Sequence, residues 1–371
     1  MHLSSLAPLL TRNGPWATVY SDTPQATESA GTERRLAARG IADELTQQGA
    51  DVATAEAVAE RLEARSPQEE PLGSVVFAAG GEVVLDLPLT DVPERRMVSW
   101  SVLPHLAPLP RLTSEDPLCL TVRVDRTGAD FQLSDAQGTH AAGRVDGDAW
   151  PVHRTSSGEM SERHFQTRVE NTWENNAALI AEATVSRFEE TGADVLVLCG
   201  DTRERRAVHE RLPQAIGAVT VETSHGGRAP GSGTELLDLE AERVRTEYAG
   251  RHAAETLEAF RAGRAPGHEP EAAEGVPALI EAAREHRVGT LLVDPEGPDA
   301  HQEVWVGPDP DQIGVRRSEL AYLGAPDPSP ARADDALLRN AAATGAEVLV
   351  PGPGEDIPVG GLGALLRWTY G

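Results

Sequence analysis

The pattern of hydrophobic and polar positions along this chain changes repeatedly between helical spacing and short apolar runs. The pattern predicts helices over residues 32–48, 52–65, 165–191, 203–212, 234–263, 276–286 and 333–344. Apolar runs bounded by turn residues predict strands at 16–20, 74–78, 82–86, 118–124, 130–133, 193–199, 218–222, 288–294, 303–306 and 347–350. Helices that alternate with apolar strands indicate an α/β (α+β multidomain) fold.

Glycine and proline mark the turns between these elements. Gly80 and Gly81 separate two apolar runs and predict a β-hairpin. Gly192 follows the long helical stretch at 165–191 and predicts its end, because glycine readily takes the left-handed conformation of a helix cap. Residues 102–110 contain three prolines, a density that predicts a linker.

The chain is long enough for two or three domains. The proline-rich stretch and a later glycine-rich loop suggest boundaries that give domains at 1–112, 113–232 and 233–371. The last two each have a helix and strand pattern of their own. No internal repeat with the period of a solenoid occurs in the sequence.

The charge of the chain is strongly acidic. It has 59 acidic residues and 33 basic residues, all of the latter arginine, which gives a net charge of −26. Catalysis by lysine and a P-loop lysine are therefore excluded. The acidic surplus suggests a salt-adapted host and argues against broad, non-specific binding to nucleic acid such as DNA.

Several kinds of site are not supported by the motifs. Cys119 and Cys199 stand alone and suggest buried thiols rather than a zinc site or a disulfide framework. The loop at 225–233 is rich in glycine but lacks both phosphate-binding patterns, and the acidic loop at 294–301 has a single histidine. We expect no catalytic residue, metal or cofactor, and with no signal peptide or apolar span we expect a cytoplasmic protein without a membrane partner.

The stretch 151–168 differs from the rest of the chain because its arginines outnumber its carboxylates. A Ser/Gly loop flanked by Arg and His and leading into a long helix suits contact with RNA phosphates and bases. An ordinary exposed loop whose arginines pair with nearby glutamates is the alternative. The candidate RNA-binding residues are His153, Arg154, Ser156, Ser157, Gly158, Arg163, His164, Gln166 and Arg168.

Three stretches resemble a known superfamily. Residues 161–176 and 196–208 resemble an actinobacterial family among the bacterial relatives of the archaeal and eukaryotic release factors. Residues 360–368 are similar to the end of the C-terminal domains of Pelota and the release factors. The resemblance implies a three-domain release-factor/Pelota-like architecture, with a central RNase H-like α/β domain and a C-terminal L7Ae-like αβα domain.

The resemblance also bears on catalysis. Release factors carry Gly-Gly-Gln in the loop before the long central helix, where the glutamine helps to place the water that cleaves peptidyl-tRNA. Here residues 156–161 read Ser-Ser-Gly-Glu-Met-Ser, with one glycine and no glutamine. Loss of a group that orients water removes the part of catalysis that depends on geometry. We therefore expect no peptide release.

The family implies a ribosome-binding factor for stress or dormancy, similar to the Balon-like hibernation factors. Such a factor would occupy the A site of idle 70S ribosomes, contact rRNA and take EF-Tu as a second partner. Arg316 and Arg317 would be partner-binding residues on the C-terminal domain, with a solvated surface pair as the alternative. The other hypotheses are a ribosome-rescue or peptide-release hydrolase acting through His153 or His164, and a scaffold that binds proteins but no RNA.

Overall fold

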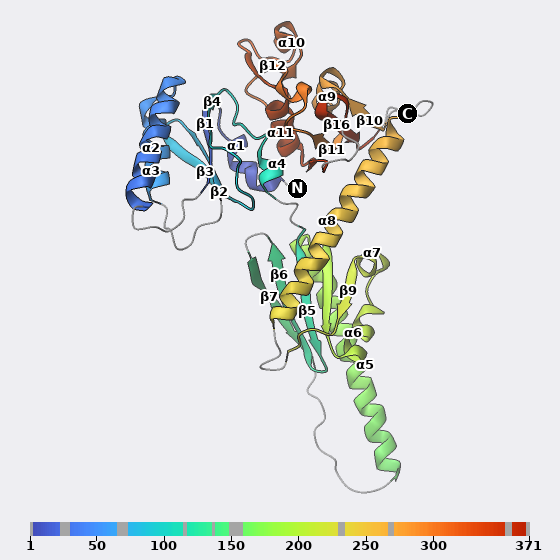
Figure 1. The fold of residues 1–371 in the computed structure, drawn as a ribbon. Helices are drawn as coiled ribbons and strands as arrows, with labels where there is room; N and C mark the ends of the chain where they lie inside the picture. Colours follow the sequence, from blue (N-terminus) through green and yellow to red (C-terminus); the bar gives the residue numbers. More distant parts are fainter. Residues whose placement is uncertain are drawn as a thin grey trace. The chain divides into compact units, whose positions relative to one another are not determined.

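A computed structural model of the chain describes residues 3–22, 30–64, 73–113, 117–135, 138–147, 159–228, 234–265, 271–352 and 358–368, with the helical backbone but not the side chains of 159–171. The chain divides into two compact units, and Figure 1 shows their elements coloured along the sequence. The first unit contains both ends of the chain, Met1–Glu115 and Ala253–Gly371. The second unit is the continuous stretch Asp116–His252, so the division falls inside one long helix, α8 (Glu235–Gly263).

The N-terminal part of the first unit is an antiparallel sheet with strand order β3-β2-β1-β4. The strands are β1 (Trp16–Asp22), β2 (Gly73–Ala79), β3 (Glu82–Leu89) and β4 (Met97–Ser101). Two helices, α2 (Ala30–Gln47) and α3 (Val52–Glu63), pack on one face around Ile41, Leu45 and Val58. The predicted hairpin is confirmed, because Gly80 and Gly81 both have positive φ in the turn between β2 and β3.

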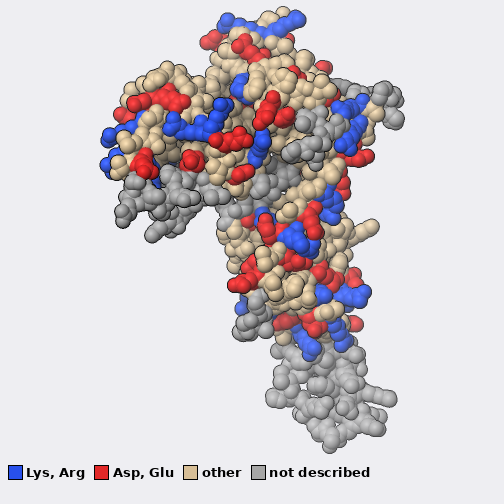
Figure 2. All heavy atoms as spheres, in the orientation of Figure 1, with Lys and Arg blue, Asp and Glu red and all other residues tan. Residues whose placement is uncertain are grey.

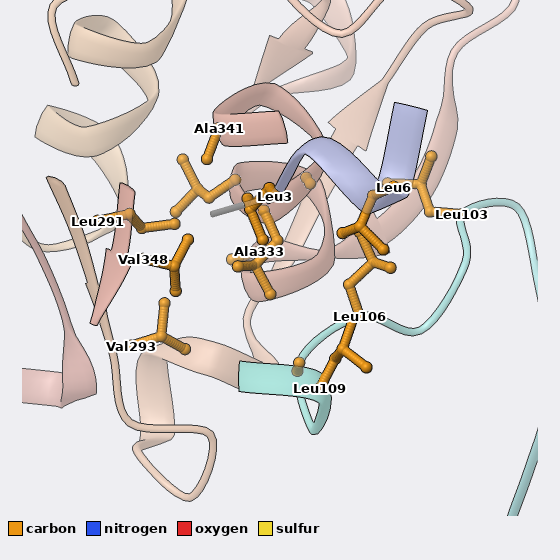
Figure 3. Packing of buried hydrophobic residues seen from close by; sticks show 14 of the residues in the cluster. Leu3, Leu6, Leu103, Leu106, Leu109, Leu291, Val293, Ala333, Ala341 and Val348 are labelled. Carbon is orange, nitrogen blue, oxygen red and sulfur yellow. The ribbon is translucent and has the colours of Figure 1, made fainter. Parts of the chain in front are cut away.

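The other face of this sheet shares one hydrophobic core with the C-terminal part of the chain. Trp16, Tyr20 and Phe77 from the sheet are fully or almost fully buried in that core. Figure 3 shows residues from both chain ends lying together in it. The labelled residues are Leu3, Leu6, Leu103, Leu106, Leu109, Leu291, Val293, Ala333, Ala341 and Val348. The two ends of the chain are therefore held together by apolar packing.

The prediction of a linker at 102–110 is wrong. This segment runs through the shared core and ends in the short helix α4 (Leu109–Leu112), with Leu103, Leu106 and Leu109 at most 6% exposed. Proline is compatible with this path because Pro110 lies in the first turn of α4, where a backbone N–H has no helical acceptor. Two further short helices, η1 (Leu3–Leu6) and α1 (Ala7–Leu10), which the pattern did not predict, also contribute to the core.

The C-terminal part of the first unit is built on a sheet with strand order β10-β16-β11-β15. These strands are β10 (Ala272–Glu274), β11 (Val288–Val293), β15 (Glu347–Leu349) and β16 (Leu362–Leu366), and only β11 and β15 are parallel. Helices α9 (Val276–Arg284) and α11 (Ala333–Thr344) pack on the face of Leu291, whereas Phe260 of α8 packs on the face of Leu292. Successive strand residues point to opposite faces, which explains this division.

A smaller sheet with strand order β13-β12-β14 extends the C-terminal part. It consists of β12 (Glu303–Val306), β13 (Ile313–Gly314) and β14 (Ser329–Arg332), and the helix α10 (Arg317–Tyr322) connects β13 to β14. The 3-10 helices η2 (Pro298–His301) and η3 (Val359–Gly361) precede β12 and β16.

The second unit is a five-stranded mixed sheet with strand order β7-β6-β5-β8-β9. The strands are β5 (Cys119–Asp125), β6 (Gly128–Asp135), β7 (Gly138–Asp146), β8 (Val195–Gly200) and β9 (Thr220–Thr223). β5, β8 and β9 are parallel, while β6 and β7 continue from β5 as an antiparallel meander. The mixed α/β class is thus confirmed, whereas the boundaries at 112 and 232 stay predictions.

Helices cover both faces of this sheet. On one face lie α5 (Glu159–Thr191), α6 (Thr202–His209) and α7 (Gln214–Ala218), which bury Ile180, Val208 and Ile216. On the other face α8 packs on Cys119 and Cys199. Within the described residues, no helix combines the length and the apolar character needed to cross a membrane.

Candidate functional site

The candidate RNA-binding residues of the sequence fall at the start of α5 and in the segment before it. His153, Arg154, Ser156, Ser157 and Gly158 lie outside the described residues. Arg163, His164, Gln166 and Arg168 lie on α5, but their side chains are outside the described part. Their joint action on RNA therefore stays a prediction. The structure does define the two places where this segment is attached, at the end of β7 and along α5.

The arm is residues 159–171, the N-terminal part of α5, which Figure 1 shows extending beyond the sheet of the second unit. The foot is the group of side chains and backbone atoms around the point where α5 meets the body of that unit. It consists of Arg126, Gly147, Trp173, Asn176, Arg203 and Glu204.

Among the described side chains of α5, the first buried ones lie at the foot. Trp173 is half-buried, and Asn176 and Ala177 are each 3% exposed. The next buried positions are Ile180, Ala181 and Thr184, which follow at the helical spacing of one face. Helix α5 is therefore packed onto the sheet from about its middle to its C-terminal end.

Arg126, in the two-residue turn between β5 and β6, connects three elements at the foot. Its backbone carbonyl accepts a hydrogen bond of 2.9 Å from Nδ2 of Asn176 on α5. Its Nε donates to Oε1 of Glu204 on α6 at 2.9 Å, and Glu204 is only 4% exposed. A buried carboxylate with a guanidinium partner is a strong, directional contact. The turn thus fixes α5 and α6 to the same end of the sheet.

A second contact joins the two helices directly. The guanidinium carbon of Arg203, in the first turn of α6, lies 4.6 Å from the ring centroid of Trp173. A guanidinium over the face of an indole ring is attracted by the ring quadrupole. Asp201 caps the N-terminus of α6, because its side chain accepts a hydrogen bond from the amide of Arg203. The interaction with Glu204 and the hydrogen bond from this amide lower the pKa of Asp201.

Gly147 brings the end of β7 against the same point of α5. Its amide donates to the carbonyl of Thr127 at 2.7 Å. A Cβ at this position would lie 2.4 Å from Oδ1 of Asn176, a separation that real Cβ atoms do not show. Only glycine fits between the β5–β6 turn and Asn176, so the chain leaves β7 in direct contact with the helix to which it returns.

Arg228 holds the neighbouring part of the sheet with three carboxylates. Its guanidinium nitrogens lie 2.8 Å from Asp125, 3.2 Å from Asp130 and 3.3 Å from Asp146, and its side chain is 12% exposed. Although burial opposes the charged forms, these pairs raise the pKa of Arg228, and hydrogen bonds from Thr127 and Arg228 lower that of Asp125. The glycine-rich stretch that precedes Arg228 thus leads into an ion cluster at the C-terminal end of β7.

A further polar cluster ties β8 to β9. Nη1 of Arg205 donates to the carbonyls of Gly200 and Thr223, each at 3.0 Å, and its Nε donates to Glu222 at 2.9 Å. Nδ1 of His209 lies 2.7 Å from the other oxygen of Glu222. Burial opposes ionisation of this carboxylate, but His209 and Arg205 together lower its pKa. The sequence pattern did not single out either cluster, because both join residues that are distant along the chain.

The two predicted partner-binding arginines lie at the start of α10 in the first unit. Both are exposed, and the guanidinium carbon of Arg317 lies 5.5 Å from the ring centroid of Trp305. Arg317 is also 3.5 Å from the carboxylate of Asp327. Tyr322, at the end of the same helix, is 93% exposed. This surface offers two exposed cations, of which Arg317 lies over an aromatic ring, and its role in binding stays a prediction.

The described residues contain no group of three or more His, Cys, Asp or Glu side chains placed to hold a metal ion. Cys119 and Cys199 are both fully buried, and burial raises their pKa values to about 11 and about 12. On the face that Figure 2 shows, arginines are interspersed with aspartates and glutamates. The acidic surplus therefore does not take the form of a single uniform surface on that face.

The match to a family model agrees with the sequence resemblance over the second unit. Residues 118–266 match a model of release factors, a segment that includes all five strands of the sheet of that unit together with α5, α6, α7 and α8. This part of the chain is therefore similar to the bacterial relatives of the release factors, as the resemblance of residues 161–176 and 196–208 predicts. The matching model is that of bacterial archaeo-eukaryotic release factor family 2.

The similarity to other proteins covers most of the chain. Uncharacterized protein Rv2629 of Mycobacterium tuberculosis strain H37Rv is 29% identical over 366 residues, which are 97% of this chain and 95% of the relative. The archaeal translation termination factor aRF1 is 16% identical, with 99% of each chain covered and a TM-score of 0.28. Archaeoglobus fulgidus Pelota is 14% identical, with 99% of this chain and 92% of Pelota covered and a TM-score of 0.31.

Proposed function

We propose that this protein binds idle 70S ribosomes at the A site as a hibernation or stress factor, without hydrolysing peptidyl-tRNA. The observation that carries the proposal is a release-factor family match over 118–266 in a chain that lacks Gly-Gly-Gln between β7 and α5. Residues 156–161 read Ser-Ser-Gly-Glu-Met-Ser in that place. A factor that keeps the scaffold and lacks the water-orienting glutamine occupies the ribosome and leaves the ester bond intact.

The RNA contacts of the proposal are local. Arg154, Arg163 and Arg168 provide positive charge in and beside the segment that leads into α5, in a chain whose net charge is −26. Repulsion between the acidic remainder and ribosomal RNA opposes binding, but salt screens it beyond about 10 Å at 0.1 M. Binding then depends on these arginines and on shape, and it should lose affinity less steeply with salt than a broadly basic factor does.

Partner binding at the other unit is a second part of the proposal. Arg316 and Arg317, the latter over the ring of Trp305, are proposed to contact the GTPase-associated region of the ribosome or EF-Tu. Arg317 is 62% exposed, so its pair with the 95% exposed Asp327 should contribute little to stability and yield readily to a partner. Replacing both arginines by glutamate should reduce the recruitment of EF-Tu while the variant remains folded.

Sucrose gradients of starved host cells test the main proposal. The protein should sediment with 70S particles, and the variant Arg154→Glu, Arg163→Glu, Arg168→Glu should move to the top of the gradient. A control with the same charge change at the exposed residues Arg35, Arg206 and Arg261 should still sediment with ribosomes. Wild-type protein found only at the top would contradict the proposal, and a control that is also lost would assign the effect to net charge.

A second assay separates occupancy from catalysis. Ribosomes that carry labelled peptidyl-tRNA should keep their label after incubation with the protein. Release of the label would favour the alternative, a ribosome-rescue or peptide-release hydrolase. Under that alternative, His153→Ala or His164→Ala should abolish the release.

A further inference from the structure

We propose that Gly147 and Asn176, joined through the turn at Arg126, are positioning residues that set the direction of the arm. The inference deepens the proposed function, because it names the residues that aim the segment proposed to enter the ribosome. It depends on the geometry of the foot within the second unit, where all of these residues are described.

The length of the arm makes the foot important. The first residue of α5 is Glu159, 17 residues before Asn176, so a rise of 1.5 Å per residue places the end of the helix about 25 Å from the foot. A tilt of about 10° at the foot would displace that end by about 4 Å. Displacements of about 1 Å already matter where groups must meet a defined site. Small losses of packing at the foot therefore become large errors of position.

Gly147 and Asn176 hold the start and the return of the segment at the same point. The chain leaves β7 at Gly147 and returns along the arm and the rest of α5 to Asn176. Asn176 donates to the carbonyl of Arg126, and Gly147 donates to the carbonyl of Thr127, so consecutive residues of one turn receive both. The ion pair of Arg126 with Glu204 also holds this β5–β6 turn.

The side chain of Asn176 and the bare Cα of Gly147 are sterically matched. A methyl group at 147 would meet Oδ1, Cγ and Nδ2 of Asn176 at 2.4, 2.5 and 3.0 Å. Because Asn176 is 3% exposed and bonded to a backbone carbonyl, it cannot turn aside without breaking that bond. An alanine at 147 must therefore push α5 away from the turn or displace Asn176.

This relationship predicts the outcome of a double-mutant cycle. Gly147→Ala should reorient the arm, and Asn176→Ala should loosen it by removing the hydrogen bond. The double variant should resemble Asn176→Ala alone, since the shortened side chain leaves room for the methyl group. Gly217→Ala is the matched control, because its Cβ would meet only His209 at 3.7 Å, an ordinary contact.

Pulsed electron-paramagnetic-resonance distances between two spin labels measure the direction of the arm. The labels are placed at Thr167→Cys on the arm and Gln214→Cys at the exposed start of α7, and the native Cys119 and Cys199 are buried from the reagent. Gly147→Ala should shift or broaden the distance distribution, and the double variant should return it to that of Asn176→Ala. Circular dichroism checks that each variant is folded.

An unchanged distribution in both folded single variants would overturn the inference. If Gly147→Ala does not fold, the distance distribution of Asn176→Ala decides the question, because that substitution adds no atoms that could clash. Ribosome binding is measured separately, and we expect about tenfold weaker binding of Gly147→Ala, with recovery to the level of Asn176→Ala in the double variant. Shifted distances with unchanged ribosome binding would leave the positioning role in place and contradict the proposed function of the arm.

Discussion

Nδ1 of His105 lies 3.0 Å from the carboxylate of Asp335, a residue 230 positions later in the chain. The same carboxylate accepts hydrogen bonds from the amides of Leu106 at 2.7 Å and Ala107 at 3.1 Å. The hydroxyl of Tyr20 in turn donates to the carbonyl of His105 at 2.8 Å. These bonds join α11 to the N-terminal sheet within the shared core, where Asp335 is 3% exposed.

Replacing Asp335 by alanine should destabilise the first unit. The change leaves the buried amides of Leu106 and Ala107 without acceptors and removes the partner of His105. Because buried polar groups without hydrogen-bond partners are costly, we expect a loss of about 3 kcal/mol in the free energy of unfolding. Hydrogen exchange of the backbone amides of residues 103–109 in the whole protein measures this loss of stability. Asp327→Ala, at a 95% exposed side chain, is the control and should have little effect.

The stability of the first unit should depend on the protonation of His105. Although burial opposes the charged ring, Asp335 raises the pKa of His105 above its ordinary value of 6.5, Arg332 opposes this effect, and Asp334 adds to it. A raised pKa gives stability that is present below about pH 6.5 and is lost as the pH rises through the folded-state value. Burial and Asp335 also raise the pKa of Asp334. Asp334 therefore likewise contributes stability that is present at low pH and is lost as the pH rises.

Unfolding measured at about pH 6 and about pH 9 tests this dependence. The wild type should lose stability over that interval, and His105→Gln should show a smaller loss. Equal losses in the two proteins would mean that other groups cause the dependence. Tyr20, the remaining titratable group of this cluster, has a pKa raised by burial and stays neutral throughout the interval.

The two native thiols should be inert in the folded protein. Cys119 and Cys199 are fully buried with pKa values of about 11 and about 12, so at about pH 8 fewer than about one in a thousand is a thiolate. A thiol-reactive dye should modify neither residue until denaturant is added. Rapid labelling of native protein would show that the α8 face of the sheet opens.

Arg228→Met should destabilise the second unit at the C-terminal end of β7. It removes the cation shared by Asp125, Asp130 and Asp146, and we expect a loss of about 1–2 kcal/mol, since these partners are partly exposed. The lowered pKa of Asp125 gives stability that is present above about pH 3.8 and is lost as the pH falls further. Thermal unfolding at neutral pH and at about pH 3 should therefore differ less in the variant than in the wild type.

Local sequence patterns predicted much of the fold. The strand at 303–306 and the helix at 333–344 have the predicted bounds. Burial alternates along the strand, and the helix ends before Gly345, whose φ is +66°. Helix α5 begins six residues earlier than predicted and ends at Thr191, immediately before Gly192, whose φ is +64°. The left-handed cap that glycine favours explains why this end was readable from sequence.

The pattern failed where distant residues decide the structure. Residues 102–110 fold into the core because Asp335 binds their amides, and no local signal reveals a partner that far away. Strand β7 was not predicted, since it is an exposed edge strand of small and polar residues without clear alternation. At the candidate site, the sequence indicated the arm but not the foot, because Arg126, Gly147 and Asn176 meet only in the folded unit.

The joining of both chain ends in one core constrains how the protein is made. His105 emerges 230 residues before Asp335, an interval of roughly 10 to 50 s at common rates of synthesis. During that time Trp16, Tyr20 and Phe77 lack the C-terminal residues of their shared core. Residues 116–252 are contiguous and can complete their own sheet meanwhile. A nascent chain interrupted after them would expose the apolar face of the N-terminal sheet, and we expect the newborn N-terminus to need chaperone protection until the C-terminal part is made.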